Sequence, residues 1–272
     1  MSVTSASEPV LTFENVGIGF DKGNVLDGLS FSVAPGETKI LIGESGSGKT
    51  LILKLAAGLI RPDSGTVHML GHDLGRMREK DLLEFRRNIG FVFQEGALFD
   101  SLTVAENVAY CLREEHVKEE EIEPQVRESL RFVEMENTLE KLPSELSGGM
   151  RRRVSIARAL VTKPDVVLYD SPTAGLDPVT AQTIITLILR LRDTQGVTSL
   201  LATHRLQDAF GLANYRFDGQ SGRVVPVANN GASRPSGAAT TFVVLREGKV
   251  YFEGSPPELA DTRDAYLRRF LM

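Results

Sequence analysis

Residues 43–50 constrain this chain most strongly, because Gly-Glu-Ser-Gly-Ser-Gly-Lys-Thr matches the pattern G-x-x-x-x-G-K-[ST] at every fixed position. Its glycines let the backbone curl so that successive N–H groups face a phosphate. A β-prone run, 38–42, precedes the loop, and an apolar helix-forming run, 51–57, follows it. A strand, a glycine loop and a helix in this order predict a nucleotide site with its phosphates at a helix N-terminus. The residues predicted to bind the nucleotide here are Gly43, Glu44, Ser45, Gly46, Ser47, Gly48, Lys49, Thr50 and Leu51.

A metal site is predicted beside this loop. Lys49 is expected to reach the β- and γ-phosphates, and the Thr50 hydroxyl is expected to ligate Mg²⁺. The apolar run 166–169 predicts a strand buried on both faces, and it ends in Asp170. Ligands bind at the carboxyl ends of strands in α/β sheets, so Asp170 is the predicted carboxylate partner of the same ion.

Two further segments carry polar groups at the ends of predicted elements. A strong helix is predicted over 151–160, and it is preceded by Ser147, Gly148, Gly149 and Met150. At this helix N-terminus they form either an anion site or a simple N-cap. His204 ends a predicted buried strand, 198–203, which makes it a candidate catalytic residue at the same sheet edge as Asp170. The three arginines at 151–153 suggest a polar helix face rather than an RNA contact.

Composition excludes several classes of protein. Lys and Arg total 31 against 36 Asp and Glu, and this net charge of −5 argues against a general nucleic-acid binder. No stretch approaches the roughly 20 apolar residues of a membrane span. The N-terminus has neither the basic start nor the apolar core of a signal peptide. The single Cys111 excludes an internal disulfide and is expected to serve in packing.

The chain order predicts one large α/β domain. We expect a disordered N-terminus, 1–9, and a nucleotide-binding domain over 10–260, with antiparallel strands at 10–16 and 29–33. A helical subdomain is expected at about 79–160, and the turn-rich stretch 218–241 is an excursion with a strand at 224–227. A hairpin over 242–253 closes the domain, and a terminal helix is expected from Pro256, with 261–272 as its separate final part.

Six features come in one fixed order along the chain: the phosphate loop, Gln94, the segment 146–150, the strand ending at Asp170, Gly175-Leu176-Asp177, and His204. This set resembles the nucleotide-binding subunit of an ABC transporter, over about 10–212 and again over 242–260. The resemblance implies a P-loop core of the ABC type, an antiparallel β lobe, and a homodimer with two ATP molecules between the copies. Ser147, Gly148, Gly149 and Met150 would then act on the ATP of the partner copy. Gln94 would ligate Mg²⁺ and sense the membrane partner, and Asp177 would orient the dimer contact. Phe20, which local evidence favours as an ordinary core residue, would stack on adenine.

Residues 94–104 and Met150 resemble a narrower group, the Mla/Mce lipid-transport ATPases, since most ABC importers carry Gln where Met150 stands. This resemblance implies a membrane permease of the MlaE type, an MCE-type lipid-binding protein, and phospholipid or another lipid as cargo. It places the chain peripherally at the cytoplasmic face of a bacterial inner membrane. A soluble ABC protein acting on ribosomes or DNA is disfavoured, because the chain has one cassette, no long coiled-coil insertion and an acidic balance.

Ser171 departs from the family pattern, which has a catalytic Glu directly after the Asp170 position. A serine hydroxyl does not accept a proton near neutral pH as a carboxylate does. Three alternatives follow: slow hydrolysis supported by His204 and by positioning, a carboxylate supplied from elsewhere, or an ATP-dependent clamp with little turnover. We favour slow hydrolysis, and the catalytic candidates are His204, Ser171 and Asp177. The excursion at 218–241 is a second departure.

Overall fold

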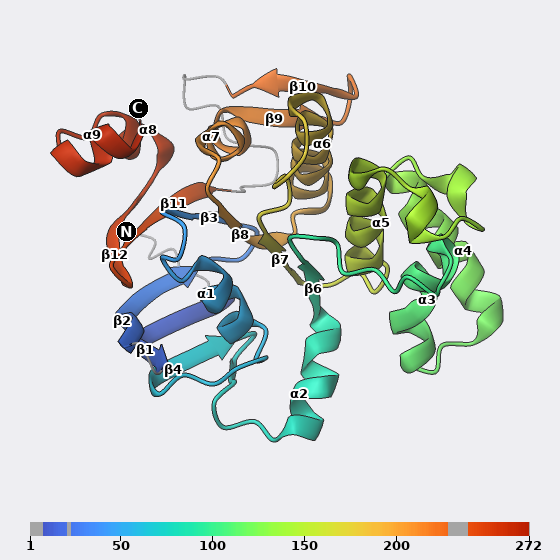
Figure 1. Cartoon of the computed structure of the whole chain (residues 1–272), viewed down its shortest axis with the longest axis horizontal. Coiled ribbons are helices and arrows are strands. Elements are labelled where there is room, and N and C mark those ends of the chain that lie inside the picture. Colours follow the sequence, from blue (N-terminus) through green and yellow to red (C-terminus); the bar gives the residue numbers. More distant parts are fainter. Residues whose placement is uncertain (1–7, 21–22, 228–238, 272) are drawn as a thin grey trace, which may run out of the picture.

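The chain is built around a six-stranded sheet that is parallel except at one edge (Figure 1). The computed structural model describes residues 8–20, 23–227 and 239–271. In spatial order the strands are β12 (Lys249–Gly254), β11 (Thr240–Arg246), β3 (Thr38–Gly43), β8 (Thr198–Thr203), β7 (Val166–Asp170) and β6 (Ile89–Val92). Only β12 runs antiparallel to its neighbour, so the carboxyl ends of the other five strands share one edge.

A second, antiparallel sheet covers one side of the first. Its spatial order is β2 (Gly23–Val33), β1 (Leu11–Phe20), β4 (Ser64–Met69) and β5 (His72–Asp73). A separate hairpin joins β9 (Tyr215–Asp218) to β10 (Arg223–Pro226). The predicted α/β class with an antiparallel lobe is therefore confirmed.

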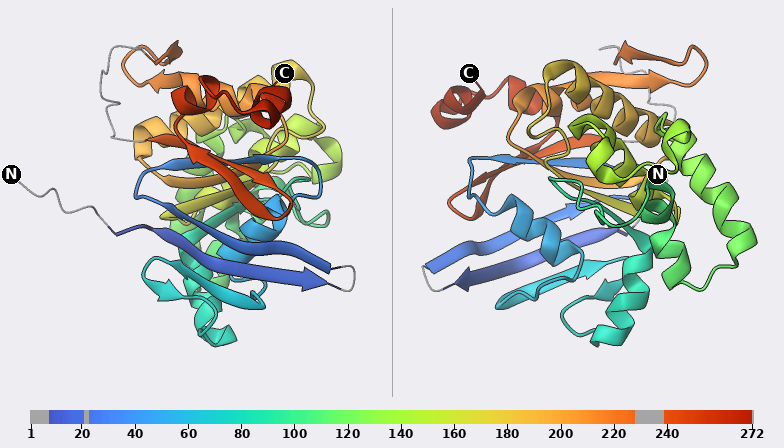
Figure 2. Two further views of the ribbon diagram at one scale, coloured as in Figure 1. Left: turned by 90° about the vertical axis from the view of Figure 1, so that its left-hand side faces the viewer. Right: turned by 45° about the vertical axis from the view of Figure 1, so that its right-hand side comes forward.

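Six of the described helices fall into three groups by position, which can be followed by colour in Figure 2. Helix α1 lies between the sheets, α3–α5 form one end of the molecule, and α6 and α7 cover the other face of the six-stranded sheet (Figure 1). The helices are α1 (Lys49–Ala56), α2 (Glu79–Phe85), α3 (Val104–Glu114), α4 (Glu119–Phe132), α5 (Gly148–Leu160), α6 (Pro178–Gln195), α7 (Leu206–Asn214), α8 (Pro256–Ala260) and α9 (Ala265–Leu271). Short 3-10 turns are η1 (Arg86–Asn88), η2 (Glu136–Thr138) and η3 (Pro143–Glu145).

Two hydrophobic clusters hold these layers together because side chains alternate across a strand. In β3, Ile40 and Ile42 point to the helices α3–α7, whereas Leu41 points to α1 and the antiparallel sheet. Every residue of β3, β7 and β8 is buried. Strand β7 thus contains the buried apolar run predicted for 166–169, and β8 is the buried strand predicted for 198–203.

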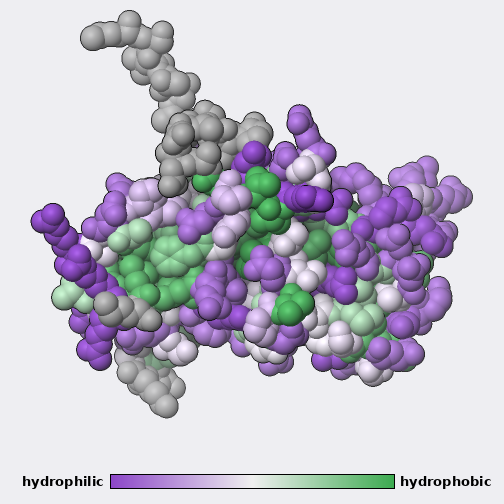
Figure 3. All heavy atoms as spheres, turned by 90° about the horizontal axis from the view of Figure 1, so that it is seen from above, coloured by the Kyte–Doolittle hydropathy of each residue, from purple (hydrophilic) through white to green (hydrophobic). Residues whose placement is uncertain are grey.

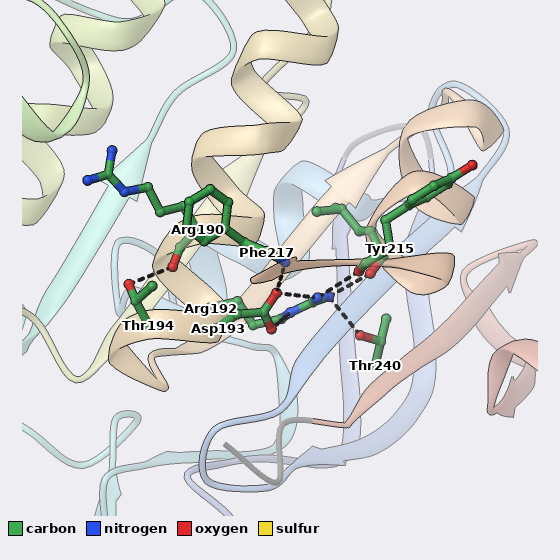
Figure 4. A network of polar contacts seen from close by, with 8 residues as sticks. Arg190, Arg192, Asp193, Thr194, Tyr215, Phe217 and Thr240 are labelled. Carbon is green, nitrogen blue, oxygen red and sulfur yellow. Dashed lines mark hydrogen bonds and ion pairs between the residues drawn. The ribbon is translucent and has the colours of Figure 1, made fainter. Parts of the chain in front are cut away.

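A buried ion pair links α6 to the segments that follow it (Figure 4). Arg192 is 1% exposed, and its guanidinium pairs with Asp193 at 2.8 Å. The same guanidinium donates to the carbonyl oxygen of Tyr215 at 2.9 Å and to Thr240 Oγ1 at 3.3 Å. Asp193 accepts a hydrogen bond from the backbone N–H of Phe217 at 2.7 Å. One pair of charges thus fixes both β9 and the start of β11.

The structure corrects two predicted elements. Strand β1 continues to Phe20 and β2 begins at Gly23, so both strands are longer than the expected 10–16 and 29–33. The C-terminal stretch forms two short helices rather than one, because a capping box at Ser255 starts α8, which stops before Asp261, and α9 begins only at Ala265.

Two other expectations lie partly outside the described residues, and a third, for 79–160, lies within them. Most of the expected disordered N-terminus, residues 1–7, lies outside them, as does 228–238 of the excursion. The expected strand at 224–227 corresponds to β10. The range 79–160 contains α2–α5 but also β6, which belongs to the six-stranded sheet.

The surface divides by polarity along the length of the molecule. Seen from above in Figure 3, hydrophilic residues cover most of the end that carries α3–α5, while apolar residues gather toward the opposite end. In the part of the chain that the structure describes, no helix is long and apolar enough to cross a membrane.

Replacement of Arg192 tests the buried ion pair. We expect Arg192→Ala to lower the free energy of unfolding by about 3–5 kcal/mol, because it leaves the buried Asp193 carboxylate without its partner. Arg76→Ala is the control, since Arg76 pairs with Asp73 while 87% exposed, and such surface pairs contribute at most about 1 kcal/mol. Urea unfolding measures both variants, and similar losses for the two would contradict this role of Arg192.

Candidate nucleotide-binding site

The phosphate loop, residues 43–50, joins β3 to α1 at the carboxyl edge of the six-stranded sheet. Gly46 and Gly48 have φ angles of 81° and 94°, which residues with a Cβ rarely adopt. A Cβ on Gly48 would lie 2.6 Å from Leu26 Cδ2, and one on Gly43 would lie 2.8 Å from the carbonyl oxygen of Leu245. Backbone conformation and close packing together explain why glycine occupies these positions.

Lys49 begins α1 and turns its ammonium back over the loop. The Nζ atom donates to the carbonyl oxygens of Gly43 at 2.9 Å and Glu44 at 2.8 Å. Burial lowers the pKa of Lys49, and the nearby charge of Asp170 acts in the opposite direction. A cation is thereby held within the ring of loop backbone, where a bound phosphate would compensate for its burial.

Thr50 and Asp170 meet although they lie far apart in the sequence. Thr50 Oγ1 donates to Asp170 Oδ1 at 3.1 Å. Burial raises the pKa of Asp170, while hydrogen bonds from Thr50 and Ser171 and the charges of Lys54 and Lys49 act against that rise. A hydroxyl beside a buried carboxylate fits Mg²⁺, which proteins usually hold through one or two carboxylates plus phosphate oxygens.

Ser171 occupies a strained position directly after β7. Its φ is 45°, which is uncommon for a residue with a side chain, and the residue is 7% exposed. Its N–H donates to the carbonyl oxygen of Ala202 at 2.8 Å, which joins the turn to β8. His204 follows β8 one residue beyond its end and is exposed. The two predicted catalytic residues therefore leave neighbouring strands at the same edge.

Gln94 is exposed in a tight turn after β6, in which the N–H of Gly96 donates to the carbonyl oxygen of Phe93 at 2.9 Å. Arg152 donates to that same carbonyl at 2.5 Å, and Arg158 donates to the Gly96 carbonyl at 2.9 Å. Both arginines come from α5. The loop that carries Gln94 is thus held by helix α5.

The prediction that residues 151–153 form a polar, solvent-facing helix surface was wrong for Arg152. This residue is 5% exposed, and it also donates to the carbonyl oxygen of Ala174 at 3.4 Å. Burial lowers the pKa of Arg152, whereas the charges of Glu95 and Asp170 raise it. Only its position on the inward face of α5, four residues before the buried Ile156, signals this role in the sequence.

The segment 147–150 lies at the start of α5, away from the phosphate loop of the same chain (Figure 1). Ser147 is the N-cap, and its Oγ accepts the N–H of Met150 at 3.3 Å. Ser147 and Gly148 are exposed, whereas Gly149 is buried against Thr180, whose Cγ2 would lie 2.2 Å from an added Cβ. The helix N-terminus therefore faces outward and is available to a second molecule.

Asp177 caps α6 by accepting the N–H groups of Val179 at 3.1 Å and Thr180 at 3.0 Å. Hydrogen bonds from Thr180 hold the pKa of Asp177 below its usual value. Arg205 donates to the carbonyl oxygens of Thr173 at 3.2 Å and Leu176 at 3.5 Å. The loop between Ser171 and Asp177 is consequently fixed from two sides, by Arg152 and Arg205.

Phe20 is the last residue of β1 and is 60% exposed. The local expectation of a core phenylalanine was therefore wrong, and an exposed aromatic ring remains compatible with stacking on a base. Leu51 is half-buried in the first turn of α1. A cavity of about 450 Å³ adjoins the loop over residues 44–47, and its wall includes Tyr266, which sequence reasoning did not single out.

Comparison with known proteins identifies relatives of this chain. The family model described as ABC transporter matches residues 26–174, which is just over half of the 272 residues. The methionine import ATP-binding protein MetN of Bifidobacterium longum is 37% identical over 226 residues, covering 80% of this chain and 56% of that protein. The intermembrane phospholipid transport system ATP-binding protein MlaF of Haemophilus influenzae is 31% identical over 255 residues, covering 93% and 87%.

A solved structure gives the same answer about the fold. The post-hydrolysis dimer of the ATP-binding cassette MJ0796, bound to ADP and Pi, matches with a TM-score of 0.75 and 28% identity. The match covers 90% of this chain and 98% of that one, and it confirms the predicted P-loop core. This chain spans only a little over half the length of MetN but most of MlaF.

Replacement of Asp170 is expected to change Mg²⁺-ATP binding and thermal stability in opposite directions. We expect Asp170→Asn to weaken Mg²⁺-ATP binding roughly tenfold or more, since it removes the carboxylate beside Thr50. Burial raises the folded-state pKa of Asp170 above its unfolded value, so the ionised carboxylate opposes folding once the pH exceeds both values. The nucleotide-free variant should therefore melt at a higher temperature than the native protein at about pH 7.

The control for this experiment is Asp165→Asn, which changes an exposed carboxylate just before β7. Calorimetric titration and thermal melting measure the two effects, and the gain in melting temperature should vanish at acid pH, where Asp170 is protonated. A variant that melts below the native protein while binding Mg²⁺-ATP normally would contradict this assignment of Asp170.

Proposed function

Since the chain belongs to the ABC transporter family and carries its ATPase cassette, we propose that it works as the ATP-hydrolysing subunit of a membrane transporter. The observation that carries this proposal is the hydrogen bond between Thr50 and Asp170, which brings the phosphate loop to a buried carboxylate and so supports an ion site there. ATP bound there would lie along residues 43–51, with Lys49 at its β- and γ-phosphates.

The metal site in this proposal consists of Thr50, Gln94 and Asp170. Mg²⁺ held there would neutralise charge on the phosphates. Thr50 and Asp170 are joined by a hydrogen bond, and Gln94 leaves β6, the strand next to β7, at the same edge. The chain's own contribution is to hold these oxygens at the ends of buried strands, where they have little freedom to move.

Two copies are needed to complete the site in this proposal. Ser147, Gly148, Gly149 and Met150 of one copy would face the γ-phosphate on the other, because the N-terminus of α5 is exposed and carries no acidic residue in its first turn. Asp177 would orient the contact from the neighbouring N-terminus of α6. The dimer of MJ0796 with ADP and Pi supports such an arrangement for a related cassette. Loss of the γ-phosphate would remove this contact and open the dimer.

Hydrolysis requires a water molecule to attack the γ-phosphorus while the bridging P–O bond to ADP breaks. We infer that His204 and the Ser171 hydroxyl position this water, since both leave neighbouring strands at the same edge. Glu95 is a carboxylate that could take its proton, because β6 pairs with β7 in parallel and Val92 stands opposite Tyr169. The chain after β6 thus continues beside Ser171, and Glu95 is exposed. Positioning and electrostatics provide most of the catalysis of phosphoryl transfer, so slow turnover is expected.

An ATP-dependent clamp is the second candidate function, and Ser171 is the observation that favours it. In that case ATP would close the dimer and regulate a partner, with little hydrolysis.

Phosphate release distinguishes the enzyme from the clamp. We expect the native protein to release phosphate from Mg²⁺-ATP measurably faster than Lys49→Ala, and Ser171→Glu to raise that rate at least about tenfold, because a general base usually contributes 10²–10⁴-fold. Lys49→Ala is the background control, since Lys49 lies within the phosphate loop. If only Ser171→Glu exceeds this background, the native protein is a clamp.

For the cargo, we propose a phospholipid or another lipid. MlaF supports this, because the similarity extends over 93% of this chain and 87% of that protein. MetN is similar over a smaller share of both chains, and its cargo is methionine. The stretch 94–104 and Met150 are the features of the sequence that favour the lipid group. The proposed partners are an MlaE-type permease and an MCE-type protein, and the proposed location is the cytoplasmic face of a bacterial inner membrane.

We propose that an exposed aromatic pair contacts the permease. Phe99 and Tyr110 are 42% and 39% exposed, and their ring centroids lie 4.6 Å apart. Phe99 is fixed by Asn107, which accepts its N–H at 2.8 Å and is itself completely buried. The pair lies on the segment that follows Gln94. Movement of the Gln94 loop would therefore be transmitted to a partner bound at this pair.

Co-purification tests the transporter assignment. We expect detergent extraction of native membranes to yield the protein together with a permease and bound phospholipid, and Phe99→Glu to reduce the recovered permease at least about threefold by placing a charge in an apolar contact. Leu83→Glu is the matched control, since Leu83 is 60% exposed on α2. Mass spectrometry identifies the protein and lipid, and a permease recovered with an amino-acid-binding protein instead would contradict the lipid proposal.

A further inference from the structure

A cavity of about 450 Å³ lies against the outer side of the phosphate loop. The loop forms one wall with residues 44–47, the start of β2 forms a second with Asn24 and Val25, and the β11–β12 turn, 245–248, forms a third. The remaining wall is the side chain of Tyr266, from the C-terminal helix α9. The segment matched by the family model ends at residue 174, far before this helix.

The position of the cavity relative to Asp170 identifies the part of a nucleotide that would reach it. In the six-stranded sheet, β3 leads into the phosphate loop, with β8 and β7 on one side and β11 on the other. The contact between Thr50 and Asp170 lies on the β7 side and marks the end where the terminal phosphate and metal belong. The cavity lies on the β11 side, so a triphosphate laid along the loop would direct its nucleoside there.

Tyr266 is held in place by its neighbours. The guanidinium of Arg246 lies 4.4 Å from the ring centroid, and the ring of Tyr251 packs edge-on at 4.9 Å. Tyr251 donates its hydroxyl to Asp264 at 2.9 Å, and Asp264 in turn accepts the N–H of Leu267 at 2.9 Å. This chain of contacts ties α9 to the β11–β12 hairpin and fixes the ring at the cavity wall.

The chemistry of the wall suits a nucleoside. An aromatic ring binds a purine or ribose by stacking and leaves its hydroxyl free for a polar contact. Burial and the charge of Glu44 raise the pKa of Tyr266, so the phenol stays neutral and can donate a hydrogen bond. Phe20 stands opposite Gly23 in the β1–β2 hairpin, next to Asn24 of the cavity wall. Phe20 thus lies in the same hairpin as Asn24, while Tyr266 lines the cavity from the other end of the chain.

We propose that Tyr266 contacts the nucleoside of bound ATP, so that helix α9 forms the outer wall of the nucleotide site. This inference rests on the proposed function, in which the phosphate loop binds ATP. It assigns the C-terminal helix a direct role in nucleotide affinity and makes Tyr266 a determinant of that affinity alongside Phe20.

Calorimetric titration with two probes tests the proposal. Mg²⁺-ADP contains the nucleoside, whereas inorganic tripolyphosphate carries only the phosphate groups. We expect Tyr266→Ala to weaken ADP binding about tenfold, the effect of losing one stacking contact, and to leave tripolyphosphate binding unchanged. Tyr266→Phe should retain most of the ADP affinity, because the ring remains. Tyr215→Ala, which removes a ring that is 44% exposed on β9, should change neither.

Each other outcome has a definite meaning. ADP binding by Tyr266→Ala within twofold of the native protein would overturn the contact, as would an equal loss for both probes, since that would be an effect on the loop alone. If Lys49→Ala binds neither ligand while Tyr266→Ala binds both as the native protein does, the phosphate site is supported and the role of α9 is refuted. If the native protein binds neither ligand, the proposed function and this inference fall together.

Discussion

The hydrogen bond between Thr50 and Asp170 is the contact on which the site depends. It joins residues 120 positions apart, and only the parallel sheet makes it possible, because β3 and β7 both pair with β8 and end at the same edge. All three strands are completely buried, so the ends that carry the polar groups are held by the packing of the core. Burial also disfavours the ionised form of Asp170, and a bound cation would relieve this cost.

Three arginines, one of them buried and two half-buried, extend this rigidity to the loops. Arg152 binds carbonyl oxygens on both the Gln94 loop and the loop after Ser171, and Arg158 and Arg205 each hold one of these loops from a second side. Backbone carbonyl oxygens accept hydrogen bonds from the guanidinium N–H groups and leave the positive charge in place. The N–H groups of these arginines therefore have partners although they are at least partly removed from water. The loops proposed to sense ATP and partner are therefore coupled through helix α5.

The sequence was most informative where the signal was local. The phosphate loop has a fixed spacing, and the buried strands ending at Asp170 and before His204 each contain a short apolar stretch, so their positions were predicted closely. The residues that were missed depend on contacts distant in sequence. The contacts of Arg152 could not be predicted, because they depend on the packing of α5 beside β6. Tyr266 lines the cavity only because α9 folds back on the β11–β12 hairpin. The strands predicted at 10–16 and 29–33 were too short, because the pairing of β1 with β2 continues to Phe20 and Gly23.

Ser171 combines an unusual backbone conformation with a side chain that departs from the family pattern. Its left-handed backbone, with φ of 45°, is sustained by a hydrogen bond to β8 and by the adjoining turn. Such strain is found where a position is dictated by function, since the surrounding structure must oppose it. The backbone at position 171 is thus held in one conformation, and the side chain that it carries is a hydroxyl. A slow ATPase, with His204 and neighbouring groups positioning the water, is consistent with this combination.

The most direct test of the central claim is an experimental structure with Mg²⁺ and a slowly hydrolysed ATP analogue. The account predicts a triphosphate wrapped by residues 43–50, with the ion at Thr50 and Asp170 and Ser147 of a second copy against the γ-phosphate. It would be contradicted by a nucleotide bound elsewhere while the Lys49 ammonium remained on the carbonyl oxygens of Gly43 and Glu44.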